Sequence, residues 1–83
     1  MRIEIFSTNC VRCRRLEFNL QQAITELGIE ADVLKVTNIA EMERRGIKAV
    51  PALAIDGKVV MMGVLPRVNH LKELITGRPG PFD

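Results

Sequence analysis

Residues 7–19 read STNCVRCRRLEFN, and the two cysteines in this stretch, Cys10 and Cys13, stand three positions apart. An apolar, strand-like run precedes them, and a helix-like pattern of apolar residues follows them. Taken alone, the pair has three interpretations: a redox pair, half of a metal site, or two buried thiols that are neighbours by chance. The remainder of the chain is needed to choose among them.

The chain has 83 residues and a formal charge of +2, and 47% of its residues are hydrophobic. This length supports one core, so we expect one domain at 1–77 and a flexible tail at 78–83. The scattered basic residues do not indicate a nucleic-acid-binding surface. Without a signal-peptide pattern, or an apolar run near the roughly 20 residues that cross a bilayer, a cytoplasmic location is expected.

That compartment bears on the cysteines, because thiols there are kept reduced. A lone stabilising disulfide is rare in such a setting, and a closely spaced pair is more often catalytic or metal-binding. The interpretation as two chance neighbours is therefore weakened.

Apolar periodicity predicts a strand over 2–7, with Ile3 and Ile5 on one face and Phe6 on the other. Cys10 is expected to open a helix that ends at Gly28, where a left-handed cap belongs. The apolar stripe of this helix starts at Cys13 and continues through Leu16, Leu20, Ala23, Ile24 and Leu27.

A second strand is predicted within 30–37, in parallel with the first. Its apolar residues fall on both faces, as in a strand covered by helices on each side: Val33, Leu34 and Val36. Asn38 and Glu41 then form a capping-box pattern for a short helix that Gly46 would end.

Two strands at 51–55 and 58–62 flank Asp56-Gly57, a pair typical of a tight hairpin. Pro66 suits the first turn of a last helix that Gly77 would end. The buried stripe expected on that helix is Val68, Leu71, Leu74 and Ile75. The resulting order, βαβαββα, predicts an α/β fold without internal repeats.

Cysteines three apart in a first helical turn are close enough to form a disulfide. Cys10, at the helix start, would face free backbone N–H groups and the positive end of the helix dipole, which favour a thiolate, so it is the expected nucleophile. Arg12 would add positive charge and tune the thiolate in the same direction, whereas Arg14 and Arg15 are better interpreted as a solvated surface. Cys13, on the buried stripe, is the expected resolving thiol.

Val50-Pro51 stands just before a predicted strand that would end beside the cysteines. Proline has no N–H, so backbone groups of Val50 would stay free to pair with an extended substrate over Cys10. A cis peptide bond here would be a deliberate turn. An ordinary trans proline at a strand start is the plainer alternative.

The stretches IEIFSTNCVRCRRLE at 3–17 and VPALAIDGKVVMMG at 50–63, with their spacing, resemble the thioredoxin/glutaredoxin superfamily. The resemblance is closest to its small archaeal and bacterial redox-active disulfide proteins and extends to about Ile75. It implies a thioredoxin-like fold with a four-stranded mixed sheet flanked by three helices. It also implies thiol-disulfide exchange through Cys10 and Cys13 without a cofactor, and a cis Val50-Pro51 bond.

The same resemblance places Gly63 where backbone passes near the site, so Asn9, Val50, Pro51 and Gly63 are the candidate substrate-binding residues. Asn9 replaces the tryptophan of thioredoxins. In glutaredoxins the last strand is followed by a Gly-Gly pair and an acidic residue that help hold glutathione. Here Gly63 is followed by Val64-Leu65-Pro66 instead. Glu4 matches the buried aspartate that assists proton transfer to the inner thiol in thioredoxins, but we expect a partly exposed strand residue there.

Two alternatives use the same cysteines: a Cu(I) or Zn(II) chaperone and a redox-sensing interaction domain. Ferredoxin-like metal chaperones end in a strand, whereas RVNHLKELI at 67–75 is predicted to end this fold as a helix. Zinc needs further ligands, and the one histidine, His70, is expected on the surface. We therefore predict no metal, and a monomeric oxidoreductase with protein disulfides as substrates and a reductase or small thiol as reductant.

Overall fold

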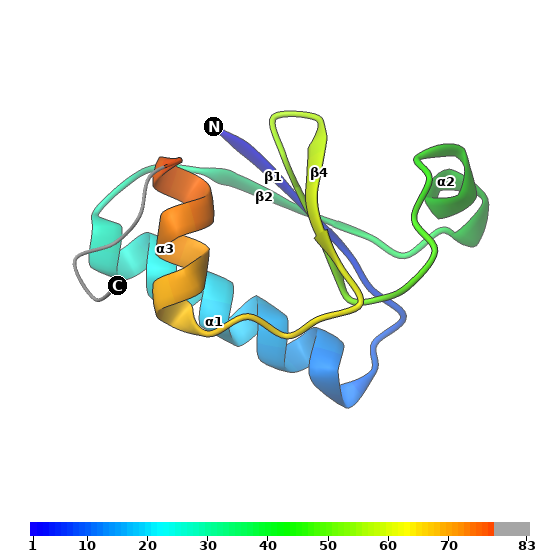
Figure 1. The fold of residues 1–83 in the computed structure, drawn as a ribbon, viewed down its shortest axis with the longest axis horizontal. Helices are drawn as coiled ribbons and strands as arrows, with labels where there is room; N and C mark the ends of the chain where they lie inside the picture. The colour runs from blue at the N-terminus through cyan, green and yellow to red at the C-terminus, as the bar shows by residue number, and fades with distance from the viewer. Residues whose placement is uncertain (78–83) are drawn as a thin grey trace.

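A computed structural model describes residues 1–77 of the chain, and the tail expected at 78–83 lies outside these residues. The elements follow the predicted order, as Figure 1 shows. They are β1 (Arg2–Phe6), α1 (Val11–Leu27), β2 (Asp32–Val36), α2 (Ile39–Arg44), β3 (Ala52–Ile55), β4 (Lys58–Met62) and α3 (Val68–Thr76). Among these helices, none has the length and apolar character that a membrane span requires.

The four strands form one mixed sheet in the order β2-β1-β3-β4. β1 pairs with β2 in parallel and with β3 in antiparallel fashion, and β3 and β4 form the predicted hairpin. Figure 1 shows α1 and α3 together on one side of the sheet and α2 apart from them. The predicted α/β class, with a four-stranded mixed sheet and three helices, is confirmed.

The alternation of side chains along β1 creates two separate cores. Ile3 and Ile5 pack with the inner faces of α1 and α3, whereas Phe6 packs on the other side of the sheet with Met42 of α2. Successive side chains of a strand point to opposite faces, so one central strand can serve both cores. Each fully buried aliphatic side chain stabilises the fold by roughly 1.5–3 kcal/mol. The buried side chains of β1 therefore contribute strongly to the stability of both cores.

α1 starts and stops where the sequence places its caps. Cys10 has an extended backbone, and its Sγ accepts a hydrogen bond from the N–H of Cys13 at 3.1 Å. At the other end Gly28 has φ 66° and donates its N–H to the carbonyls of Ile24 and Thr25. The predicted stripe is confirmed, since its buried members are Cys13, Leu16, Leu20, Ala23 and Ile24.

The shorter elements also follow local signals. The Asn38 side chain accepts from the N–H of Glu41 at the start of α2, and Asp56 and Gly57 both have positive φ in the hairpin turn. α3 begins slightly later than expected, because Arg67 is its N-cap and Pro66 lies before the helix.

The expectation that β2 is covered on both faces is wrong. β2 lies at an edge of the sheet, and Val33 and Leu34 remain 39% and 43% exposed. Leu34, in register with Glu4, lies on the α2 face, and α2 is too short and too far along the sheet to cover it, since the second core reaches only Val36 on this strand. Val33, in register with Ile3, lies on the opposite face and outside the first core. An apolar run on both faces of a strand is typical of a buried strand, but it does not distinguish one from a solvated edge strand.

The expectation that Glu4 is partly exposed is also wrong, because only 5% of the residue is accessible to solvent. Both of its carboxylate oxygens accept hydrogen bonds from the Arg45 guanidinium, at 2.9 and 3.0 Å. The same guanidinium lies 5.4 Å from the centre of the Phe6 ring. A charged side chain is seldom buried without a partner, and here the partner comes from the end of α2, 41 residues away.

The ion pair fixes the charge state of Glu4. Its hydrogen bonds with Arg45 hold the pKa of the Glu4 carboxyl below its ordinary value of 4.5, against the opposing effect of burial. A carboxyl whose pKa is lowered in the folded state stabilises the fold above its ordinary pKa. This contribution is lost as the pH falls through the folded value.

Arg45→Ala should therefore lower the free energy of unfolding by about 2 kcal/mol at neutral pH, because it leaves a buried carboxylate without its main partner. Arg44→Ala is the matched control, since Arg44 pairs with Glu41 at the surface and should cost less than about 0.5 kcal/mol. Urea unfolding should show the wild-type advantage over Arg45→Ala shrinking as the pH falls below 4.5. Equal effects of the two substitutions would contradict a structural role for the pair.

Candidate active site

The two cysteines lie at the junction of the β1–α1 connection and the first turn of α1, where they form a disulfide. Their Cα atoms are 5.0 Å apart. Cys13 is fully buried, whereas Cys10 is half-buried at the helix N-cap. Of the two sulfurs, the one at the helix start is therefore the more accessible to an incoming reactant.

A tight turn delivers Cys10 to the helix start. Asn9 has a positive φ of 62°, a conformation that asparagine adopts more readily than most residues. Its N–H donates to the Oγ of Ser7 at 3.0 Å, and the N–H of Ser7 donates to the carbonyl of Val36 in β2. Ser7 is fully buried, so its hydroxyl fixes the turn from inside. Asn9 itself is exposed and precedes Cys10 directly.

The Val50–Pro51 peptide bond is cis. Pro51 is buried and precedes β3, whose first residue Ala52 pairs with Phe6 at the end of β1. Val50 is half-buried, and in the described part of the chain its backbone N–H and carbonyl make no hydrogen bond. An extended segment of another chain could therefore pair with Val50 in the manner of an added strand.

Gly63 connects three segments of the site: the cysteine turn, the segment with the cis Val50–Pro51 bond, and the end of β4. Its N–H donates to the Pro51 carbonyl at 2.8 Å, and its own carbonyl accepts from Nη2 of Arg12 at 3.0 Å. Arg12 thus reaches from between the cysteines to the segment after β4. The sequence predicted positive charge here, but it did not predict that the guanidinium would be held by a backbone carbonyl.

The conformation of Gly63 suits no other residue well. Its φ is 72°, and a Cβ added to it would lie 2.9 Å from the Cβ of Ala49. Ala49 was not recognised from the sequence, and no motif marks it. The contact of Met62 was not predicted either. Its Sδ accepts a hydrogen bond from the N–H of Lys48 at 3.2 Å, which connects β4 to the segment before Pro51.

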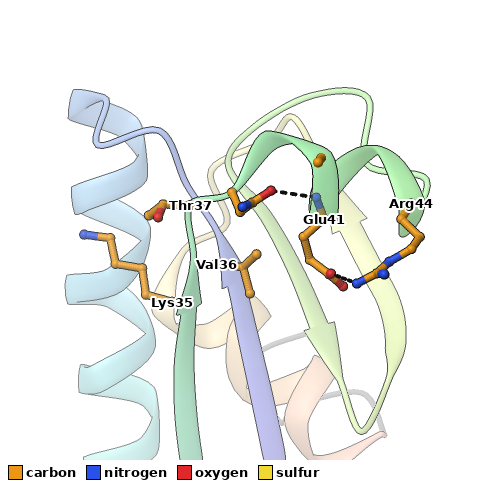
Figure 2. A pocket seen from close by; sticks show the side chains of 7 residues that line it. Lys35, Val36, Thr37, Glu41 and Arg44 are labelled. Atoms are coloured by element: carbon orange, nitrogen blue, oxygen red, sulfur yellow. Dashed lines mark hydrogen bonds and ion pairs between the residues drawn. The ribbon is translucent and has the colours of Figure 1, made fainter.

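The remaining candidates lie elsewhere. His70 is exposed on α3, as predicted, and among residues 1–77 no three histidine, cysteine or acidic side chains gather as a metal site. A hollow of about 670 Å³ between the end of β2 and α2 is drawn in Figure 2. In this hollow the N–H of Glu41 donates to the Asn38 side chain, and the Glu41 carboxylate pairs with Arg44. None of the predicted site residues lines the hollow.

This arrangement suits thiol-disulfide exchange. One sulfur is accessible at the positive end of a 17-residue helix, and the other is buried one turn further along. Helix N-termini favour thiolates, and a neighbouring buried thiol can resolve a mixed disulfide. Chain topology also separates the fold from the ferredoxin-like metal chaperones, because α3 and not a strand is the last element described.

Comparisons with known proteins agree with the geometry. The family model described as "Thioredoxin domain" matches residues 1–76. A thioredoxin of Methanothermobacter thermautotrophicus is 34% identical over 76 residues, which cover 92% of this chain and 99% of that protein. A thioredoxin of Methanocaldococcus jannaschii is 37% identical over 71 residues, which cover 86% of this chain and 81% of the relative.

Gly63→Ala should destabilise the fold by about 2–3 kcal/mol, because it combines an unfavourable positive φ with a contact that must be relieved. It should also lower the rate of disulfide exchange, since the strain falls on the segment that holds Pro51 and Arg12 in place. Urea unfolding and an exchange assay measure the two effects.

Gly28→Ala is the matched control, because Gly28 has a similar φ of 66° with nothing within 4 Å of an added Cβ. It should cost only about 1 kcal/mol and leave exchange unchanged. Adding Ala49→Gly to Gly63→Ala should restore the part of the loss that comes from the contact. If both glycine substitutions cost the same and the double variant gains nothing, the close approach to Ala49 is not what constrains Gly63.

Proposed function

Because the chain belongs to the thioredoxin family and is a thiol-disulfide oxidoreductase, we propose the part that each residue of its site takes in the exchange. Cys10 is the attacking thiolate. Its half-exposed position at the N-cap of α1, against the full burial of Cys13, is the observation that carries this assignment. Arg12, held beside it by the Gly63 carbonyl, favours the charged form.

The proposed cycle has two exchange steps. The Cys10 thiolate attacks one sulfur of a substrate disulfide, forms a mixed disulfide, and releases the other substrate sulfur as a thiolate. Cys13 then attacks the Cys10 sulfur, which breaks the mixed disulfide and releases the second substrate thiolate. The substrate gains two electrons, and the protein is left with the Cys10–Cys13 disulfide.

We propose that the substrate docks as an extended segment over Cys10. The unpaired backbone groups of Val50 would bind it, with Pro51, Asn9 and Gly63 forming the floor and sides of the contact. Backbone pairing by itself places few demands on the sequence of the substrate.

Thioredoxins act on protein disulfides and are reduced in turn by a reductase. We propose that this protein works in that way in the cytoplasm, as a monomer, with a dithiol reductase or a small thiol restoring Cys10 and Cys13. A sensor that uses the same pair would also oxidise and reduce reversibly, but it would not turn over a disulfide substrate catalytically.

Titration of the metal-free protein in buffers of defined dithiol-to-disulfide ratio tests the redox assignment. Alkylation and mass measurement should show both thiols appearing together in a single two-electron transition. Multiple turnover of a disulfide peptide with a dithiol reductant should follow. A pair that never oxidises, or that oxidises without turnover, would contradict the proposal.

Cys13→Ser should accumulate a mixed disulfide with a substrate peptide through Cys10, because the second step is lost while the first remains. Intact-mass measurement should find most of the protein carrying one peptide. Cys10→Ser is the control and should carry almost none, since its remaining thiol is fully buried. Trapping by both variants, or by neither, would require the roles to be reassigned.

A further inference from the structure

Three arginines at the start of α1 are not explained by stability. Arg12, Arg14 and Arg15 are exposed in the first five residues of a helix whose first turn has no acidic residue. Cations at this end oppose the helix dipole and cost a few tenths of a kcal/mol each, up to about 1 kcal/mol. Within residues 1–77 none of the three forms an ion pair. A locally unfavourable arrangement of this kind is typical of a functional surface.

Two of these arginines share the outward face of α1 with exposed apolar side chains. Val11 and Phe18 are 75% and 62% exposed, and positions 11, 15 and 18 fall on one helical stripe opposite the buried one. The Arg15 guanidinium lies 5.6 Å from the centre of the Phe18 ring. Exposed aromatic and arginine side chains in contact are the combination enriched in protein interfaces.

This face changes character along the helix. Its first half carries Val11, Arg14, Arg15 and Phe18. The exposed positions that follow on the same side carry no positive charge and no large apolar side chain: Gln21, Gln22, Thr25 and Glu26, the last of which pairs with Lys72 of α3. The apolar and basic half begins one residue after Cys10 and is therefore continuous with the redox site. A face needed only for solubility would not concentrate its positive charge and its apolar area at that one end.

We propose that Val11, Arg14, Arg15 and Phe18 form a docking surface that selects protein disulfides flanked by acidic residues. The proposal rests on the disulfide exchange proposed above and names its substrate class. The arginines pair with carboxylates beside the substrate cysteine, and Val11 and Phe18 cover an apolar side chain next to them. Such pairing contributes more to encounter and selectivity than to affinity, as expected for a protein that must release its product.

A pair of peptides provides the probe. Each peptide carries a leucine and one cysteine bonded to a reporter thiol, and they differ only in that glutamates beside the cysteine in one are glutamines in the other. The pre-reduced protein should cleave the glutamate peptide about fivefold faster, in kcat/KM, at low ionic strength. The ratio should approach one between about 10 mM and 1 M salt, as the Debye length falls from about 30 Å to about 3 Å.

Arg14→Gln/Arg15→Gln should abolish the preference for the glutamate peptide. Lys58→Glu is the matched control, because it changes the net charge by the same two units at the far end of the sheet. Lys58 is exposed and pairs with Ile55, which lies opposite Ile3, whereas the site adjoins Phe6 and Ala52. Because the ratio compares two peptides on the same variant, a change in Cys10 reactivity cancels. Phe18→Ala should raise KM about threefold for both peptides and leave kcat unchanged.

Loss of the preference in the double variant together with its retention in Lys58→Glu supports the proposal. Equal cleavage of both peptides by the wild type, or equal loss of preference in Lys58→Glu, would overturn it, because selectivity would then be absent or due to net charge alone. An unchanged KM in Phe18→Ala would overturn the proposal that Val11 and Phe18 bind an apolar side chain of the substrate. Failure to cleave either peptide would instead contradict the proposed disulfide exchange.

Discussion

The backbone of Gly63 is the constraint on which the geometry of the site depends. One of its polar groups binds the Pro51 carbonyl and the other receives Arg12, so a single residue connects the cysteine turn, the cis-proline segment and the end of β4. These connections need a positive φ and a close approach to Ala49, and only glycine meets both requirements without strain. The sheet places the three segments at one end, and Gly63 sets their spacing.

Most of the fold and the centre of the site could be predicted because their signals are local. The cap at Cys10, the left-handed Gly28, the Asn38 cap and the Asp56-Gly57 turn each depend on a few neighbouring residues, and all are present. The cysteine pair, the cis bond before Pro51 and the position of Gly63 followed from motifs and their spacing. Local preference and overall fold agree at these points, as is expected of a sequence that specifies one structure.

The features that sequence did not predict depend on which elements meet in space. Whether Leu34 is covered depends on the length and position of α2, and α2 does not reach it. Val33 lies on the opposite face of this edge strand, outside the first core. Glu4 is buried because Arg45, far along the chain, folds back over β1. The Arg12 contact and the crowding at Ala49 are likewise products of packing. Charge and spacing made Arg12 a candidate site residue, but only the three-dimensional structure identifies the carbonyl that binds it.

The resemblance to thioredoxins matches Glu4 to an aspartate that assists proton transfer, yet Arg45 engages both oxygens of Glu4 and lowers its pKa. An effective general base has a pKa near the working pH, so a carboxylate of this kind is a poor acceptor for a thiol proton. We therefore expect the departing thiolate of the substrate, and not Glu4, to accept the proton of Cys13. The pace of the second exchange step would follow the basicity of the sulfur that leaves, and the chemistry of the target would in part set the turnover of the protein.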